Sequence, residues 1–198
     1  MIEYIRGSIA ALNPAAAVLE TAGGVGYVLN ISLLTFSALE GKTEGRLLVH
    51  EVIREDAYQL YGFAQERERE LFRMLIGVSG VGASTALIVL SSLGPAELEG
   101  VIASGDAKRL KSVKGIGTKT AERIIVDLRD KIKSAGSTLI FQTGEQKATQ
   151  SEAFDEAHAA LVMLGFDRKA AEKVLTAIFK DEPAIKVEQA IKKALPRL

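Results

Sequence analysis

The sequence predicts a multi-domain α and β protein: an N-terminal five-stranded OB-fold β-barrel, a middle all-α domain, a flexible linker and a C-terminal three-helix bundle. Three observations lead to this prediction. Short β-rich runs fill the first third of the chain, helical periodicity with a repeated glycine turn follows, and a polar stretch then precedes a last helical segment. We therefore expect four segments, residues 1–63, 64–134, 135–151 and 152–198.

Residues 1–63 are expected to form a small closed barrel of the oligonucleotide-binding (OB) type. Asn13-Pro14 and Gly23-Gly24 mark the early turns, and Leu33–Leu39 is expected to connect two strands. Five short strands with one such connection suit a closed barrel, and a small open sandwich is the alternative. The expected strands cover residues 2–12, 16–21, 25–32, 46–53 and 57–63.

Residues 64–134 are expected to be helical, because apolar residues recur there at helical spacing. Gly94 is expected to end one helix immediately before Pro95 begins the next. The expected helices cover residues 66–76, 84–93, 95–104, 106–113 and 119–133.

Two stretches of this helical region repeat each other. Val78–Ala86 and Val113–Ala121 both place hydrophobic-x-Gly-hydrophobic-Gly between helical segments, and Gly80 and Gly115 stand 35 residues apart. Glycine lets the main chain approach a ligand closely, and the N–H groups that begin the following helix are unpaired at its positive end. The repeat therefore predicts two phosphate-binding turns, a grip suited to the backbone of a nucleic-acid duplex.

The two copies are unequal in charge. Lys114, Lys119 and Arg123 flank the second copy, whereas the first offers only the hydroxyls of Ser84 and Thr85. For the first copy taken alone, a purely structural role of its glycines is an equal alternative. The residues expected to contact DNA are Gly80, Gly82, Ser84, Thr85, Lys114, Gly115, Gly117, Thr118, Lys119, Thr120 and Arg123.

Charge is unevenly distributed, although the formal net charge of the chain is zero. Residues 1–63 carry 4 basic and 7 acidic groups, residues 64–134 carry 12 and 9, and residues 135–198 carry 9 of each. The segment with both glycine turns is thus the electropositive one, which is the footprint of a phosphate binder.

Several other site types are excluded. The first copy has the glycine spacing of a nucleotide phosphate loop, but Ala83-Ser84 stands where that loop needs Lys-Ser/Thr. The chain has no cysteine and only two histidines, which argues against disulfides and against thiolate or histidine metal sites. We expect no cofactor, no metal and no catalytic residue in this chain. Because no secretory signal or membrane-spanning run is evident, a cytoplasmic protein is expected.

A charged turn, Arg54-Glu55-Asp56, is expected at the tip of a hairpin between two β-runs. A solvated surface turn is the simpler interpretation. The functional alternative is that Glu55 and Asp56 face DNA, where repulsion of phosphates selects a particular DNA shape.

The last third of the chain is expected to contain a linker and a small bundle. Residues 135–151 are polar and small apart from the apolar Leu139-Ile140-Phe141, which predicts a flexible linker. Residues 152–198 are expected to form three short helices that bury little surface, so that exposed apolar side chains there would bind a partner. The candidate partner-binding residues are Leu161, Leu164, Phe166, Ile191 and Leu195.

With barrel, tandem glycine turns, linker and three-helix tail in this order, the chain resembles the RuvA family over its whole length. That family comprises the junction-recognising subunits of the bacterial Holliday junction branch migration complex. The resemblance is most specific at Arg54-Glu55-Asp56, at Leu60–Phe63 and at Gly115–Arg123. In that family the glycine turns are called helix-hairpin-helix motifs.

The resemblance implies a non-catalytic subunit that binds four-way junction DNA in an open planar form, for recombination, DNA repair and the SOS response. It implies a homotetramer, or two stacked as an octamer, with Glu55 and Asp56 as an acidic pin at the crossover. It also implies that residues 152–198 bind RuvB, the hexameric ATPase that holds ATP and Mg²⁺, with the RuvC resolvase joining a larger complex. Many members have lysine at the positions of Ser84 and Thr118, so fewer salt-dependent phosphate contacts are expected here.

Two other functions use the same features. A repair nuclease or glycosylase would use the hairpins as a DNA handle, with an acid such as Asp127 or Asp130 beside them. A DNA-tethered adaptor would use residues 152–198 to hold a protein partner.

Overall fold

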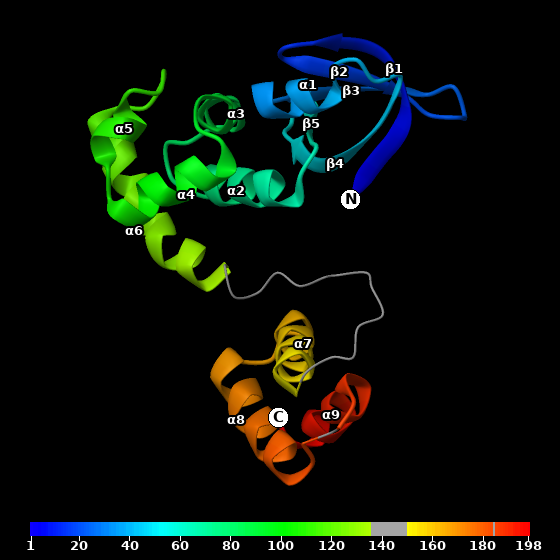
Figure 1. The fold of residues 1–198 in the computed structure, drawn as a ribbon, viewed down its shortest axis with the longest axis vertical. Helices are drawn as coiled ribbons and strands as arrows, with labels where there is room; N and C mark the ends of the chain where they lie inside the picture. Colours follow the sequence, from blue (N-terminus) through cyan, green and yellow to red (C-terminus); the bar gives the residue numbers. More distant parts are fainter. Residues whose placement is uncertain (136–149, 184) are drawn as a thin grey trace. The chain divides into compact units, whose positions relative to one another are not determined.

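The computed structural model describes residues 1–135, 150–183 and 185–198. The chain divides into two compact units, Met1–Ser134 and Ala135–Leu198, each with its own core (Figure 1). The predicted linker, with the apolar run at residues 139–141, lies almost entirely outside the described residues.

The first unit begins with a closed five-stranded barrel, which confirms the predicted OB-like architecture and not the open sandwich. The strands follow the order β1-β2-β3-β5-β4, and every pairing is antiparallel except that of β3 with β5. The strands are β1 (Tyr4–Asn13), β2 (Ala16–Glu20), β3 (Gly26–Ile31), β4 (Glu44–Ile53) and β5 (Tyr58–Phe63).

The segment predicted as a connection between strands is a helix, α1 (Leu33–Leu39). Ser32 caps it, since the Ser32 hydroxyl oxygen accepts the N–H of Thr35 at 3.1 Å. Leu39 is buried with the barrel residues, so α1 contributes to the barrel core.

Helices complete the first unit and match the predicted ones to within two residues at most ends. Pro95 begins a helix as expected, with Gly94 at its N-cap, whereas the preceding helix ends at Ser92 with Leu93 at its C-cap. The helices are α2 (Glu66–Ile76), α3 (Ala83–Ser92), α4 (Pro95–Ser104), α5 (Ala107–Lys111) and α6 (Thr118–Ala135).

The last barrel strand packs into the hydrophobic core of these helices. The ring of Phe72 on α2 lies 5.0 Å from that of Tyr61 and 4.9 Å from that of Phe63, both on β5 (centroid to centroid). All three side chains belong to the cluster that also holds the interior faces of α3 to α6. Residues of β5 therefore belong to the helical core, whereas the interior of the barrel forms a separate cluster.

Two buried charged residues of α2 also tie it to the barrel. Arg69 donates to the carbonyls of Glu3 (3.0 Å) and Val49 (3.3 Å) and pairs with the carboxylates of Glu3 and Glu66. Glu68, fully buried, accepts hydrogen bonds from the hydroxyls of Ser32 and Thr35. Burial raises the pKa of the Glu68 carboxyl, although these hydrogen bonds oppose the shift.

The second unit is a helical bundle whose core is built largely from small and aliphatic residues. Asp167 caps the middle helix by accepting the N–H of Ala170 at 3.0 Å. Its elements are α7 (Gln150–Met163), α8 (Arg168–Asp181), α9 (Val187–Ala194) and the short 3₁₀ turn η1 (Leu195–Arg197).

No single helix within the described ranges is both long and apolar enough to cross a membrane. Helices α3 and α4 pass that test of length and composition only as a pair, and they are bent by 97° at their break.

Candidate nucleic-acid interface

The two glycine turns have the same backbone. In the first hairpin (Val78–Ala86) the N–H of Val81 donates to the carbonyl of Val78 at 3.0 Å. In the second hairpin (Val113–Ala121) the N–H of Ile116 donates to the carbonyl of Val113 at 3.1 Å. Gly80 and Gly115 have φ angles of +90° and +89°, a region that side chains with a Cβ rarely adopt. The sequence repeat is thus a structural repeat.

The hairpin glycines offer free hydrogen-bond donors. Within the described residues, the backbone N–H groups of Gly80, Gly82, Gly115 and Gly117 donate to no protein group. All four residues are exposed. Each hairpin leads into a helix, α3 or α6, whose first N–H groups have no partner within the helix. Such a cluster of unpaired donors at the positive end of a helix attracts a phosphate.

The hairpins lie side by side, and their neighbouring residues correspond in the two directions. A Cβ placed on Gly80 would be 4.0 Å from Thr120 Oγ1, and one placed on Gly115 would be 4.0 Å from Thr85 Cγ2. Each threonine thus borders the glycine of the other hairpin. The two donor clusters therefore belong to one surface of the first unit.

Every residue predicted to contact DNA is exposed or half-buried on or beside these hairpins. Arg123 differs from the simple prediction, because its guanidinium donates to the carbonyl oxygen of Ser79 at 3.4 Å. This long hydrogen bond links α6 to the first hairpin, so that Arg123 holds the hairpins together as well as adding charge. The sequence repeat alone does not reveal this link.

The acidic turn lies at the tip of the β4–β5 hairpin. The N–H of Arg54 donates to the carbonyl of Ala57 at 2.8 Å, which leaves Glu55 and Asp56 as a two-residue loop. Both carboxylates are exposed, as are Ile53 (72%) and Tyr58 (58%) immediately behind them. The hairpin therefore projects from the barrel with its acidic residues at the end.

The base of this projection is braced by Glu51. Its carboxylate accepts hydrogen bonds from the Tyr58 hydroxyl (2.5 Å) and from the N–H of Ile2 (2.9 Å). The bond from Tyr58 is the main cause that holds the pKa of the Glu51 carboxyl below its usual range, and the same bond raises the pKa of Tyr58.

The structure corrects one candidate partner-binding residue in the second unit. Leu161 is fully buried between helices, so it stabilises the bundle and offers no contact surface. Leu164 (62% exposed) and Leu195 (42%) are accessible, and Phe166 and Ile191 are half-buried. Met163, which the sequence did not single out, is the last residue of α7 and is 80% exposed.

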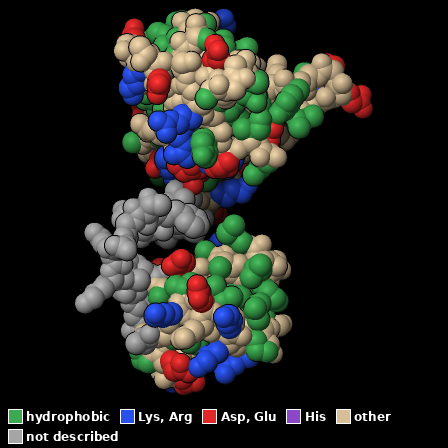
Figure 2. Space-filling model, turned by 90° about the vertical axis from the view of Figure 1, so that its right-hand side faces the viewer, with side chains coloured by type: hydrophobic (Ala, Val, Ile, Leu, Met, Phe, Trp, Pro, Cys, Tyr) green, Lys and Arg blue, Asp and Glu red, His purple; other side chains and the backbone are tan. Residues whose placement is uncertain are grey.

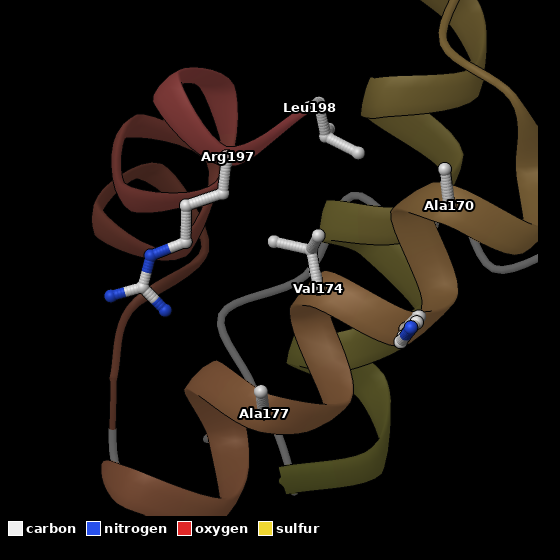
Figure 3. A pocket seen from close by; sticks show the side chains of 6 residues that line it. Ala170, Val174, Ala177, Arg197 and Leu198 are labelled. Carbon is white, nitrogen blue, oxygen red and sulfur yellow. The ribbon is translucent and has the colours of Figure 1, made fainter.

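The surface of this unit carries both apolar and charged side chains. Figure 2 shows hydrophobic side chains gathered on one side of it, with Lys, Arg, Asp and Glu side chains on the adjoining surface. A groove of about 410 Å³ runs between α8 and the end of the chain, with Ala170, Val174 and Ala177 along one wall and Arg197 and Leu198 along the other (Figure 3).

Among the described residues, no group of three or more His, Asp or Glu side chains could hold a metal ion. Asp127 and Asp130 are exposed on α6 without a third acid beside them.

Comparison with known proteins gives consistent matches along the chain. Residues 1–62 match the model of the RuvA N-terminal domain, residues 72–130 a SAM-like helix-hairpin-helix tandem, and residues 152–198 the RuvA C-terminal domain. Relatives named Holliday junction branch migration complex subunit RuvA align over the full length of both chains. They include proteins of Bacteroides thetaiotaomicron and Parabacteroides distasonis, each 52% identical, and of Porphyromonas gingivalis, 47% identical.

Proposed function

Because this chain belongs to the RuvA family, we propose that it is the non-catalytic subunit of a branch migration complex and binds four-way junction DNA. The observation that carries this proposal is the pair of adjacent hairpins with free N–H donors. Those donors, with nearby hydroxyls and lysines, suit phosphate oxygens, so recognition is by backbone and shape and not by base sequence. The protein acts where the chromosome is, in the cytoplasm.

Phosphate-binding hairpins of this kind bind any duplex, so a preference for a junction needs a second structural feature. We assign it to Glu55 and Asp56, which project from the barrel and would repel a phosphate backbone brought close to them. In a homotetramer, four such tips lie near the crossover of the junction. Their repulsion of phosphates there favours DNA whose strands diverge into four arms. Two tetramers stacked on one junction would give the octamer.

The second unit is proposed to bind the motor. Its exposed apolar residues Met163, Leu164 and Leu195 fit a protein contact better than DNA, since they offer neither charge nor a donor. The partner is the hexameric ATPase RuvB, which binds ATP and Mg²⁺, and the RuvC resolvase joins the larger assembly.

The proposal predicts that the protein binds a four-way junction at least tenfold more tightly than a linear duplex of equal length and sequence. The measurement is an electrophoretic mobility shift titration with both DNAs at one salt concentration. Equal affinities would contradict junction recognition. Cleavage of the junction in Mg²⁺ would instead support the nuclease alternative.

The double variant Glu55→Gln/Asp56→Asn tests the selecting element in the same titration. Removing both charges relieves the repulsion of phosphates, so the linear duplex should bind more tightly and the preference for the junction should fall. Lowered affinity for both DNAs would contradict this role for the tip. Glu20→Gln/Glu44→Gln, which neutralises two exposed acids elsewhere on the barrel, is the matched control.

Leu164→Glu is predicted to weaken binding of the RuvB motor by at least tenfold and leave junction binding unchanged. A charge at this exposed position disrupts an apolar contact without entering the bundle core. The measurement is the affinity of each variant for the purified motor. Val126→Glu, at an exposed position of α6, is the control. Unaltered motor binding by Leu164→Glu would exclude Leu164 from the contact.

A further inference from the structure

Three lysines lead along the chain into the second hairpin at intervals of three residues. Lys108 and Lys111 lie on α5 and Lys114 lies in the turn that follows, and all three are exposed. Three residues of helix advance by about 4.5 Å, so Lys108 and Lys111 lie close to one side of α5. A DNA strand carries one charge per roughly 3.4 Å of helix axis, a comparable spacing.

Two acidic residues in the same part of the chain are engaged by Arg109. Glu97 pairs with the guanidinium of Arg109 (Nη2 to Oε1, 2.5 Å), and Asp106 accepts the N–H of Arg109 at 3.0 Å to cap α5. Across the described part of the chain, no ion pair involves Lys108, Lys111 or Lys114. Three like charges without a counter-charge repel one another, which an external anion would relieve.

The first hairpin has no such row. The residues at the corresponding positions, 35 earlier, are Arg73, Ile76 and Ser79. Arg73 is half-buried and Ile76 packs against the core. The two hairpins therefore share a backbone but differ in the charge that reaches them from the preceding helix.

We propose that Lys108 and Lys111 extend the second hairpin into a longer phosphate-binding surface, and that the two hairpins bind DNA by different means. The second hairpin then carries most of the salt-dependent affinity through its lysines. The first binds through uncharged N–H and hydroxyl groups and contributes affinity that changes little with salt. This inference rests on the proposed DNA-binding function and assigns two residues to it.

A structural role is the competing explanation, because lysines in the last turn of a helix interact favourably with its partial negative charge. The two roles affect different measurable quantities. Loss of a dipole interaction lowers the free energy of unfolding and leaves the salt dependence of DNA binding unchanged. Loss of a phosphate contact changes the dependence of log K on log salt concentration.

The test is a salt titration of junction binding by the full-length protein and by Lys108→Gln/Lys111→Gln. Each released phosphate contact changes the log–log slope by about 0.9, so the double variant should have a slope shallower by about 1.8. Lys108→Arg/Lys111→Arg keeps both charges and should restore the slope. Lys169→Gln/Lys186→Gln removes two exposed charges from the second unit and should leave it unchanged.

Gly80→Val is the converse variant. It should lower the affinity for the junction at every salt concentration without changing the slope of log K against log salt concentration. An unchanged slope in the α5 double variant, with junction binding retained, would overturn the inference and leave the proposed function standing. Absence of DNA binding by the unaltered protein would overturn both. If a thermal melt shows the double variant unfolded, Lys108→Gln alone should lower the slope by about 0.9.

Discussion

Replacing Gly115 with valine is expected to weaken junction binding by roughly 10- to 100-fold. Gly115 has a φ of +89°, which is strained for a β-branched residue, so the turn must change shape. The N–H groups of Gly115 and Gly117 would then no longer converge on one phosphate. A hydrogen bond to a charged group contributes about 1.5–3 kcal/mol, and each 1.4 kcal/mol is about a factor of ten in affinity.

Gly41→Val separates this effect from general strain. Gly41 also has a left-handed φ, +75°, with nothing within 4 Å of an added Cβ, and lies in the barrel region away from both hairpins. It should cost comparable stability in a chemical denaturation and leave junction affinity unchanged. Equal loss of binding in both variants would show that stability, and not the hairpin, limits binding.

Removing the buried carboxyl of Glu68 is expected to lower the free energy of unfolding by about 2–4 kcal/mol. In Glu68→Ala the hydroxyls of Ser32 and Thr35 lose their acceptor inside the protein, and a cavity replaces the side chain. Urea denaturation of the two proteins at one pH measures the difference. A loss below about 0.5 kcal/mol would mean that the site relaxes or admits water.

Glu68→Gln keeps the shape of the site and removes its titration. Because burial raises the folded-state pKa of Glu68 above its ordinary value of 4.5, the folded protein holds this proton at pH values where the unfolded chain has lost it. The contribution of Glu68 to stability is therefore greatest below pH 4.5 and falls as the pH rises through the folded-state pKa. Stability of the wild type relative to Glu68→Gln should decline over that interval, and a rising difference would contradict the sign.

The hairpins could be predicted from sequence because their chemistry is local. A glycine at φ > 0 and a following helix need only a few adjacent residues, and the repetition of the pattern at Gly80 and Gly115 removed most of the ambiguity. The five strands could be predicted for the same reason. Their closure by the parallel β3–β5 pair depends on residues about 30 positions apart, such as Leu29 and Leu60, which no local pattern specifies.

The burial of charged side chains could not be predicted from sequence, because it depends on contacts with residues far away in the chain. The run Glu66–Glu70 alternates acid and base and suggests a solvated helix surface, yet Glu68 and Arg69 are buried. Their partners, at Ser32, Thr35 and Glu3, are more than 30 residues away. Leu33–Leu39 was expected only to connect two strands, and it forms a helix that Ser32 caps and whose Leu39 lies in the barrel core.

The reciprocal placement of each hairpin glycine beside the other hairpin's threonine corresponds to an approximate local dyad. The antiparallel strands of a duplex are related by dyads of their own, perpendicular to the helix axis. On the proposed function, one chain would present the same turn geometry to each of the two strands of an arm, although the second hairpin carries more charge. The contacts with the two strands would then differ in how strongly salt weakens them, and not in the backbone geometry that holds them.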